Sequence, residues 1–305
     1  MAKRLVLIDG HAIIHRAYHA LPPLTSSSGQ LVNAVYGFAS MLLRVIEELK
    51  PTHMAVCFDL PGPTFRHEAY IGYQAKRPVM DKELSSQIEL VHEVVTAAGI
   101  PIYIAPGFEA DDVLGTLARQ AARTEVVIVT GDRDILQLVG GRVKVYMTIR
   151  GLADAKMFGE KDVEEYIGVK PSQIVDYKAL IGDSSDNYPG ATGIGPKTAL
   201  SLLGQFDNIE NIYKNLDKIP GKVAGKLKDG HDGAILSQNL AQIRTDAPVE
   251  LDLEKAKLSD LAKNEKFVEK LREFRFRSLV ARLGEPASAK VSARQGKTNG
   301  QMGLI

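Results

Sequence analysis

Acidic side chains recur at the ends of short apolar runs in this 305-residue sequence. Asp9 follows the first run, Asp59 the second, and Asp132 and Asp134 a later one, while the acidic stretch 109–112 opens an amphipathic segment. If the runs are parallel strands, their carboxyl ends meet at one edge of a sheet, where ligands gather. Carboxylates about 4 Å apart repel by about 1 to 4 kcal/mol per pair, so such a cluster requires a multivalent cation. Oxygen ligands indicate a hard cation, Mg²⁺ or Mn²⁺.

A further acidic group lies in the sequence Gly182-Asp183-Ser184-Ser185-Asp186-Asn187, which alone is typical of a loop with an Asx turn. The net charge of the chain is +1, but without the nine candidate ligands 38 basic residues face 28 acidic ones. An acidic metal site within a basic protein suits a phosphodiester substrate, since lysine and arginine bind the flanking phosphates. The nine candidates are Asp9, Asp59, Glu109, Asp111, Asp112, Asp132, Asp134, Asp183 and Asp186.

A glycine-rich turn at 190–199 enters a predicted helix and exposes backbone N–H groups that can bind phosphate. A dinucleotide fingerprint would need a preceding strand and a glycine where Thr198 stands, and a Walker loop would need lysine directly after Gly195, where Pro196 stands. A hairpin of two helices that binds the DNA backbone fits this sequence, and a plain interhelical turn is the alternative.

The segment Leu60–Leu84 interrupts the otherwise regular pattern with three prolines and two glycines. It combines basic residues with the aromatic residues Phe65, Tyr70 and Tyr73. Single-stranded nucleic acid is bound by this combination, because cations pair with phosphates and rings stack on bases. A solvated surface loop is the alternative reading.

The remaining pattern predicts an α/β fold with a mainly parallel sheet, followed from about Val163 by a helical region. The single cysteine, Cys57, lies in an apolar run, so we expect it to be buried and unreactive. No stretch approaches the ~20 apolar residues of a membrane span. The predicted strands are Arg4–Ile8, His53–Phe58, Ile102–Ile104, Glu125–Thr130 and Val143–Tyr146, and the predicted helices between them are Leu31–Leu49, Leu84–Ala98 and Glu109–Ala122.

Five motifs in order resemble the flap endonuclease family, and within it the 5′→3′ exonuclease domains of bacterial DNA polymerases I. The resemblance extends from about Lys3 to Leu283. It implies a PIN-like core, a helical arch and a helix-two-turns-helix element that binds duplex DNA, often with K⁺. The motifs are Leu7-Ile8-Asp9-Gly10, Phe65-Arg66-His67-Glu68, Glu109-Ala110-Asp111-Asp112, Thr130-Gly131-Asp132-Arg133-Asp134 and Gly182-Asp183-Ser184-Ser185-Asp186-Asn187, followed by Gly193-Ile194-Gly195-Pro196-Lys197-Thr198-Ala199.

The resemblance implies two cations per active site. The residues that match its first site are Asp9, Asp59, Glu109 and Asp111, with Asp112 acting nearby through water. Those that match its second site are Asp132, Asp134, Asp183 and Asp186, with Asp111 facing both cations. It also implies DNA contacts by Tyr73, Gly193, Gly195, Lys197 and Thr198.

The sequence departs from the family at one position in the arch. The family usually has Tyr-Lys-x-x-Arg, with the lysine close to the scissile phosphate, but here Gln74 follows Tyr73. A lysine appears two residues later as Lys76, and Arg77 keeps the matching position. We predict that Lys76 replaces the missing cation, with Arg66 as the alternative.

These observations predict a structure-specific 5′→3′ exonuclease and 5′-flap endonuclease that acts on flapped, nicked or gapped DNA in replication and repair. A DNA-structure-binding protein without activity would have lost ligands, and a PIN-type ribonuclease would lack the glycine turn and the helical region. The predicted domains are a nuclease core (1–182, arch about 60–84), a helical DNA-binding region (183–284) and a flexible tail or truncated linker (285–305). We expect a cytoplasmic, nucleoid-associated monomer, away from membranes, that is linked to or acts with a DNA polymerase.

Overall fold

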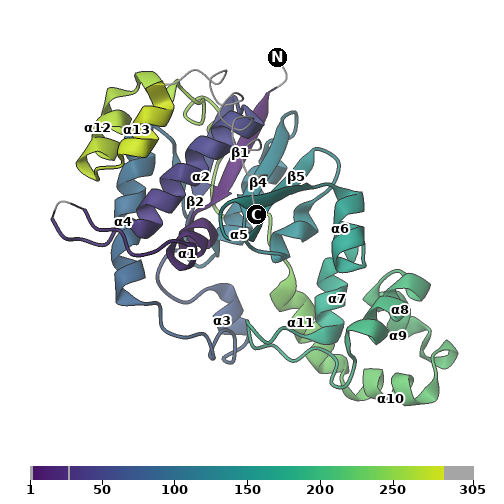
Figure 1. Ribbon diagram of the computed structural model, residues 1–305. Coiled ribbons are helices and arrows are strands. Elements are labelled where there is room, and N and C mark those ends of the chain that lie inside the picture. Colours follow the sequence, from purple (N-terminus) through teal and green to yellow (C-terminus); the bar gives the residue numbers. More distant parts are fainter. Residues whose placement is uncertain (1–2, 27, 285–305) are drawn as a thin grey trace, which may run out of the picture.

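The computed structural model describes residues 3–26 and 28–284, which form a six-stranded sheet and a helical region (Figure 1). The strand order is β3-β2-β1-β4-β5-β6, and β6 alone among these strands is antiparallel to its neighbour. The strands are β1 (Arg4–Asp9), β2 (His53–Cys57), β3 (Ile102–Tyr103), β4 (Glu125–Thr130), β5 (Val143–Arg150) and β6 (Asp154–Phe158).

Two apolar layers cover the sheet, because alternate residues of each strand face opposite sides. Val6 and Ile8 of β1 pack in one layer, and Leu5 and Leu7 pack in the other. The first layer contains α1 (Gly10–Ala20), α2 (Asn33–Leu49), α4 (Lys82–Ala97), α12 (Glu265–Glu273) and α13 (Arg277–Gly284). The second layer contains α5 (Ala110–Gln120) and continues into the helical region.

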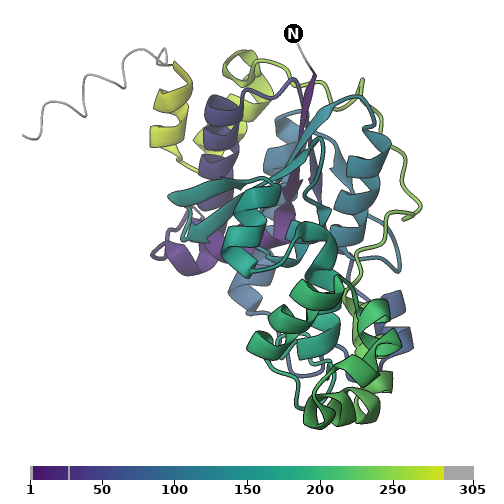
Figure 2. The same cartoon turned by 90° about the vertical axis from the view of Figure 1, so that its right-hand side faces the viewer.

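The helical region extends away from the sheet, as Figure 2 shows. Its α11 packs along α7, which in turn contacts the sheet through the 3₁₀ turn Asp134–Leu138. None of the helices in the described ranges is long and apolar enough to cross a membrane. The helices of this region are α6 (Glu160–Ile167), α7 (Ile174–Ile181), α8 (Pro196–Phe206), α9 (Ile209–Lys214), α10 (Gly221–Asp229) and α11 (His231–Ala241), with further 3₁₀ turns at Pro171–Gln173, Leu216–Lys218 and Leu261–Lys263.

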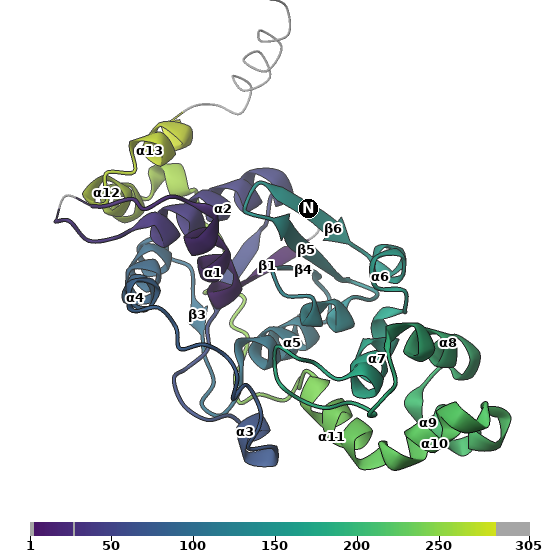
Figure 3. The ribbon, with the colours of Figure 1, turned by 60° about the horizontal axis from the view of Figure 1, so that its bottom comes forward.

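The predicted strands are all present, and Cys57 is buried as expected. Strand β6 was not predicted, because it lies at the edge of the sheet and four of its five residues are exposed or half-buried. The segment Leu60–Leu84, which interrupts the regular pattern of the sequence, contains the short helix α3 (Phe65–Ala69). Figure 3 shows α3 set apart from the sheet, beyond α5. The predicted tail 285–305 lies outside the described residues.

Candidate active site

The first group of carboxylates lies where β1, β2 and β4 end. Asp9 ends β1 and caps α1, accepting the N–H of Ala12 at 3.0 Å. The Thr130 hydroxyl, at the end of β4, donates to Asp9 Oδ2 at 2.7 Å and accepts the N–H of Asp132 at 2.9 Å. Asp59 Oδ1 accepts the N–H of Ala110 at 2.7 Å, which ties the end of β2 to the first turn of α5. The strand ends therefore position acidic side chains from separate motifs against one another.

Burial and repulsion by neighbouring carboxylates raise the pKa values of Asp9 and Asp111. Burial raises the pKa of Asp9 to about 7, partly opposed by hydrogen bonds from Ala12 and Thr130 and reinforced by Asp59 and Asp132. Burial also raises the pKa of Asp111 well above its usual value, and Asp132 and Asp9 are its strongest acidic neighbours. Among the described residues no basic side chain forms an ion pair with these two carboxylates. A divalent cation between these carboxylates would offset their repulsion and favour their ionised forms.

The second group consists of Asp134, Asp183 and Asp186, each contributing a carboxylate oxygen within 4.8 Å of the others. Within ranges 3–26 and 28–284, this is the single set of at least three acidic, histidine or cysteine side chains that meets this distance. The carboxylate oxygens of the first group lie farther from one another. A cation there would therefore keep more water ligands, as Mg²⁺ usually does. Asp132 connects the groups, since its charge raises the pKa values of both Asp111 and Asp134.

Two basic side chains pair with the second group. Lys178 Nζ lies between Asp134, which it contacts closely, and Asp183 Oδ2, at 2.6 Å. Arg77 Nη2 donates to Asp186 Oδ1 at 2.9 Å. Burial alone would raise the pKa of Asp183, but Lys178 and Ser185 hold it at about 2. The three carboxylates therefore have two cationic partners before any metal is considered.

Asp112, expected near the first cation and acting through water, is paired with Arg66 in this structure. It is fully buried, and its Oδ2 and Oδ1 accept hydrogen bonds from Arg66 at 2.7 and 2.9 Å. The backbone N–H groups of Glu109 and Arg244 donate to the same oxygens at 3.1 and 2.8 Å. Each carboxylate oxygen of Asp112 thus accepts one hydrogen bond from Arg66 and one from a backbone N–H. In this arrangement Asp112 anchors the start of α5.

Arg66, the alternative cation of the sequence analysis, is 2% exposed and equally committed. Besides Asp112, it donates to the carbonyl oxygens of Leu240 and Gln242 and lies 3.2 Å from Glu109 Oε2. Burial would lower its pKa, but Asp112 and Glu109 raise it. Arg66 thus joins α3, α5 and the end of α11 and cannot reach a phosphate without leaving this network.

The loop 70–77 after α3 lies against the second carboxylate group through its backbone. The N–H of Gln74 donates to the carbonyl of Asp186 at 2.9 Å, and Asn187 donates to the carbonyl of Gly72 at 2.7 Å. Tyr73 is buried, and its hydroxyl donates to Glu109 Oε2 at 3.2 Å. Its ring, predicted to contact DNA, is therefore covered by protein.

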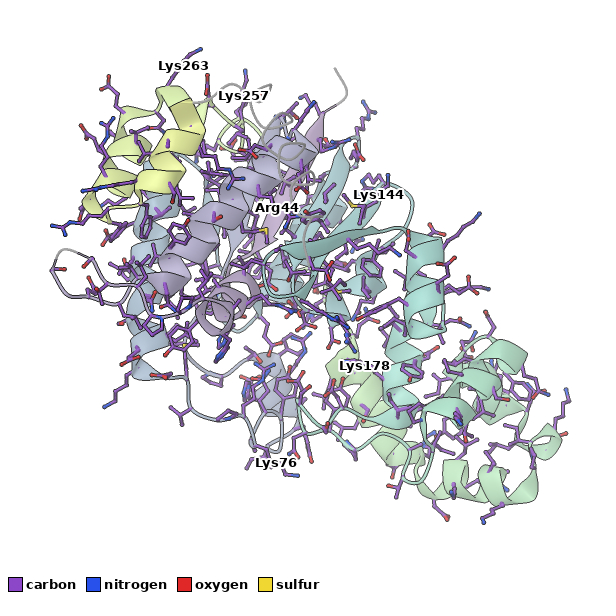
Figure 4. The ribbon with its side chains drawn as sticks, viewed as in Figure 1. Arg44, Lys76, Lys144, Lys178, Lys257 and Lys263 are labelled. Atoms are coloured by element: carbon purple, nitrogen blue, oxygen red, sulfur yellow. The ribbon has the colours of Figure 1, made fainter. Side chains whose placement is uncertain are left out.

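Lys76 is exposed, whereas its neighbour Arg77 pairs with Asp186. Figure 4 shows Lys76 at the outer edge of the molecule and Lys178 towards its centre. The prediction that Lys76 replaces the missing arch lysine remains untested, and of these two neighbours Arg77 is the one that pairs with a carboxylate of the second group.

The glycine turn leaves one side open to solvent. Gly193 has φ +83°, and Gly195 caps α8 with open space at its Cβ position. Gly193, Gly195 and Lys197 are exposed, and Thr198 is half-buried. Lys226 of α10 donates to the Gly193 carbonyl at 2.9 Å and holds the turn in place. The predicted contact residues of the turn, Gly193, Gly195, Lys197 and Thr198, thus share a surface that a phosphate backbone can approach.

Sequence reasoning missed Thr130 and Lys178. Thr130 ends a strand directly before the Gly-Asp-x-Asp motif, which is a position that could have been noticed. Lys178 lies five residues before Asp183 on α7, and its charge gave no signal among 38 basic residues.

Two family models match consecutive parts of the chain. Residues 4–168 match the N-terminal resolvase-like domain of 5′-3′ exonucleases, and residues 169–264 match their C-terminal SAM fold. DNA polymerase I of Bacillus caldotenax is 44% identical over 295 residues, and the thermostable DNA polymerase I of Thermus thermophilus is 42% identical over 284. These matches cover 94% and 92% of this chain but 33% of each relative, so the chain spans about a third of their length.

Solved structures share the fold at low sequence identity. A T5 5′-exonuclease with bound zinc ions superposes with a TM-score of 0.68 at 18% identity, covering 93% of this chain and all of the other. Human GEN1 in complex with Holliday junction DNA superposes with a TM-score of 0.57 at 14% identity, covering 94% of this chain and 76% of the other.

Proposed function

Because the chain belongs to the 5′-3′ exonuclease family, we propose that it cleaves DNA phosphodiester bonds as a structure-specific 5′→3′ exonuclease and 5′-flap endonuclease. The observation that carries the proposal is the convergence of acidic residues from separate motifs at the strand ends, beside Asp134, Asp183 and Asp186. A cavity of about 500 Å³ lined by Asp132, His15 and His19 lies next to them. Solved relatives with bound metal and DNA support this reading.

We propose that two divalent cations, Mg²⁺ or Mn²⁺, bind in the site. Asp9, Asp59, Glu109 and Asp111 would hold one, and Asp132, Asp134, Asp183 and Asp186 would hold the other. When bound, the cations supply an activated water and neutralise the negative charge of the scissile phosphate. All of these ligands are carboxylate oxygens, which Mg²⁺ and Mn²⁺ prefer. The raised pKa values of Asp9 and Asp111 also fit cation binding at this site.

The chain's own groups supply orientation and charge. Thr130 fixes Asp9 relative to the Asp132 backbone, and the Arg66–Asp112 pair fixes the first turn of α5, which carries Asp111. Arg77, once released from Asp186, would present a guanidinium to the phosphate and stabilise charge that grows in the transition state. No side-chain nucleophile is required.

Duplex DNA would bind to the glycine turn, since the free backbone N–H groups at the start of α8 face solvent near Gly195 and Lys197. Contacts of this kind read DNA shape and not base sequence. We also propose that the activity serves primer removal and repair together with a DNA polymerase, because the relatives are DNA polymerases I.

The experiment compares cleavage of a 5′-flap duplex, a nicked duplex, single-stranded DNA and the matching RNA, each with Mg²⁺ and with EDTA. We expect cleavage of the flap and nicked DNA in Mg²⁺ alone, leaving a 5′-phosphate product. Binding without cleavage would support a DNA-structure-binding protein, and preferred cleavage of RNA would support a ribonuclease.

A further inference from the structure

The Tyr188 hydroxyl is buried without a hydrogen-bond partner among the described residues. The residue is 4% exposed. A buried polar group without a partner destabilises the folded state, and a phenylalanine would fill the same volume without that penalty. The groups around the Tyr188 hydroxyl therefore indicate what it can bind in another state of the protein.

The backbone places Tyr188 beside the second carboxylate group. Asp183 and Tyr188 exchange two backbone hydrogen bonds of 3.0 Å and form an antiparallel bridge that closes the loop between them. The side chains of such a directly opposed pair lie on the same side. Tyr188 also belongs to a small apolar cluster that includes Val175, which precedes Lys178 by one turn of α7. Tyr188 is therefore held beside Asp183 and close to the helix that carries Lys178.

Electrostatics agrees with this placement. Burial raises the pKa of the Tyr188 phenol, Lys178 lowers it, and the carboxylates of the second group raise it. The hydroxyl is therefore within electrostatic reach of Lys178 and of all three acids.

A cation at the second group would have to replace Lys178. The ammonium contacts both oxygens of Asp134 and Oδ2 of Asp183. The other Asp183 oxygen accepts the N–H and hydroxyl of Ser185. No oxygen of Asp134 or Asp183 is thus free of a donor. The displaced ammonium, whose side chain is 15% exposed, then needs a new acceptor.

We propose that the Tyr188 hydroxyl is the second hydrogen-bond partner of Lys178, which accepts its ammonium when a divalent cation binds to Asp134, Asp183 and Asp186. This inference rests on the proposed function, which puts a cation at that group. The hydrogen bond from Lys178 to Tyr188 forms only in the cation-bound state, because the hydroxyl has no partner in the metal-free state. It therefore lowers the free energy of the cation-bound state alone. Tyr188 therefore tightens cation binding without touching the cation.

The test is a Mn²⁺ titration of the DNA-free protein, followed by the electron paramagnetic resonance signal of free Mn²⁺. We expect Tyr188→Phe to weaken binding at the second site about tenfold, the size expected for a hydrogen bond to a charged group. Lys178→Met removes the competing ammonium and should tighten binding. In the Lys178→Met background, Tyr188→Phe should change the affinity by less than about twofold, because the two residues act as a pair.

Two controls make the result specific. Tyr213→Phe, whose hydroxyl donates to the Leu227 carbonyl, should leave Mn²⁺ affinity unchanged. Without metal, Tyr188→Phe should melt no lower than the wild-type protein, because it removes only an unpartnered hydroxyl.

If Tyr188→Phe weakened Mn²⁺ binding equally in the wild-type protein and in Lys178→Met, the inference would be overturned. The hydroxyl would then bind a water ligand of the cation. An unchanged affinity in Tyr188→Phe would also overturn it and indicate that Lys178 moves into solvent. Asp183→Asn separates these results from failure of the proposed function: if the wild-type protein has no Mn²⁺ site that this variant removes, both are wrong.

Discussion

Arg77 Nη2 lies 2.9 Å from Asp186 Oδ1, and this ion pair joins the loop after α3 to the second carboxylate group. Two hydrogen bonds support the same contact: the backbone N–H of Gln74 donates to the Asp186 carbonyl, and the Asn187 side-chain amide donates to the Gly72 carbonyl. The loop is thereby held over the acidic residues, with one cation facing them.

The first prediction compares Arg77→Ala with its neighbour Lys76→Ala. Removing one cation that stabilises a transition state typically lowers turnover by about 10²- to 10³-fold. We expect a loss of this size for Arg77→Ala in single-turnover cleavage at saturating flap DNA, and a change below about threefold for Lys76→Ala. The reverse order would restore Lys76 as the replacement for the missing arch lysine.

The second prediction concerns the buried pair of Arg66 and Asp112. Asp112→Ala leaves a buried guanidinium without its carboxylate, so the free energy of unfolding should fall by about 3–5 kcal/mol. Urea denaturation measures this, and the double variant Arg66→Met/Asp112→Leu should recover part of the loss. Unchanged stability of Asp112→Ala combined with weaker Mn²⁺ binding would show that Asp112 is a metal ligand after all.

The third prediction separates DNA binding from chemistry at the glycine turn. Protein atoms leave the Cβ position of Gly195 open, so Gly195→Val should obstruct only a ligand that approaches the turn. We expect about tenfold weaker binding of duplex DNA with little change in saturated single-turnover cleavage. Gly204→Ala, on the same helix with equally open space, is the matched control. A thousandfold loss of saturated cleavage by Gly195→Val would assign the turn to the active site.

The fourth prediction follows from the pKa of Asp9, which burial raises to about 7 from 3.8. A raised pKa in the folded state contributes stability that is complete below pH 4 and is lost as the pH rises through about 7. Metal-free Asp9→Asn should therefore exceed the wild-type protein in stability at pH 8, by up to about 4 kcal/mol, and much less at pH 5. Thermal melting with EDTA at both pH values measures this, and Mg²⁺ should remove the advantage. An advantage independent of pH would contradict it.

The sequence could predict the sheet and the acidic residues, because strand ends follow from apolar runs and carboxylates are conspicuous there. Asp9 and Asp132 were found in this way. It could not predict the partners of those acids: Lys178 reaches Asp134 across 44 residues, and Arg66 reaches the carbonyl of Leu240 across 174. Such contacts depend on how α7 and α11 pack, which no local pattern records. The pairing of Asp112 with Arg66 could not be predicted for the same reason, since Arg66 comes from α3.

The central claim is that the carboxylates at the strand ends perform cleavage through bound cations and are not needed for DNA affinity. Asp132 connects both groups, so Asp132→Ala tests it most directly. We expect single-turnover cleavage of a 5′-flap duplex in Mg²⁺ to fall at least about 10³-fold, while flap binding in Ca²⁺ stays within about tenfold of wild type, because phosphate contacts elsewhere supply the affinity. Cleavage by Asp132→Ala at the wild-type rate, or undiminished wild-type cleavage in EDTA, would contradict the account.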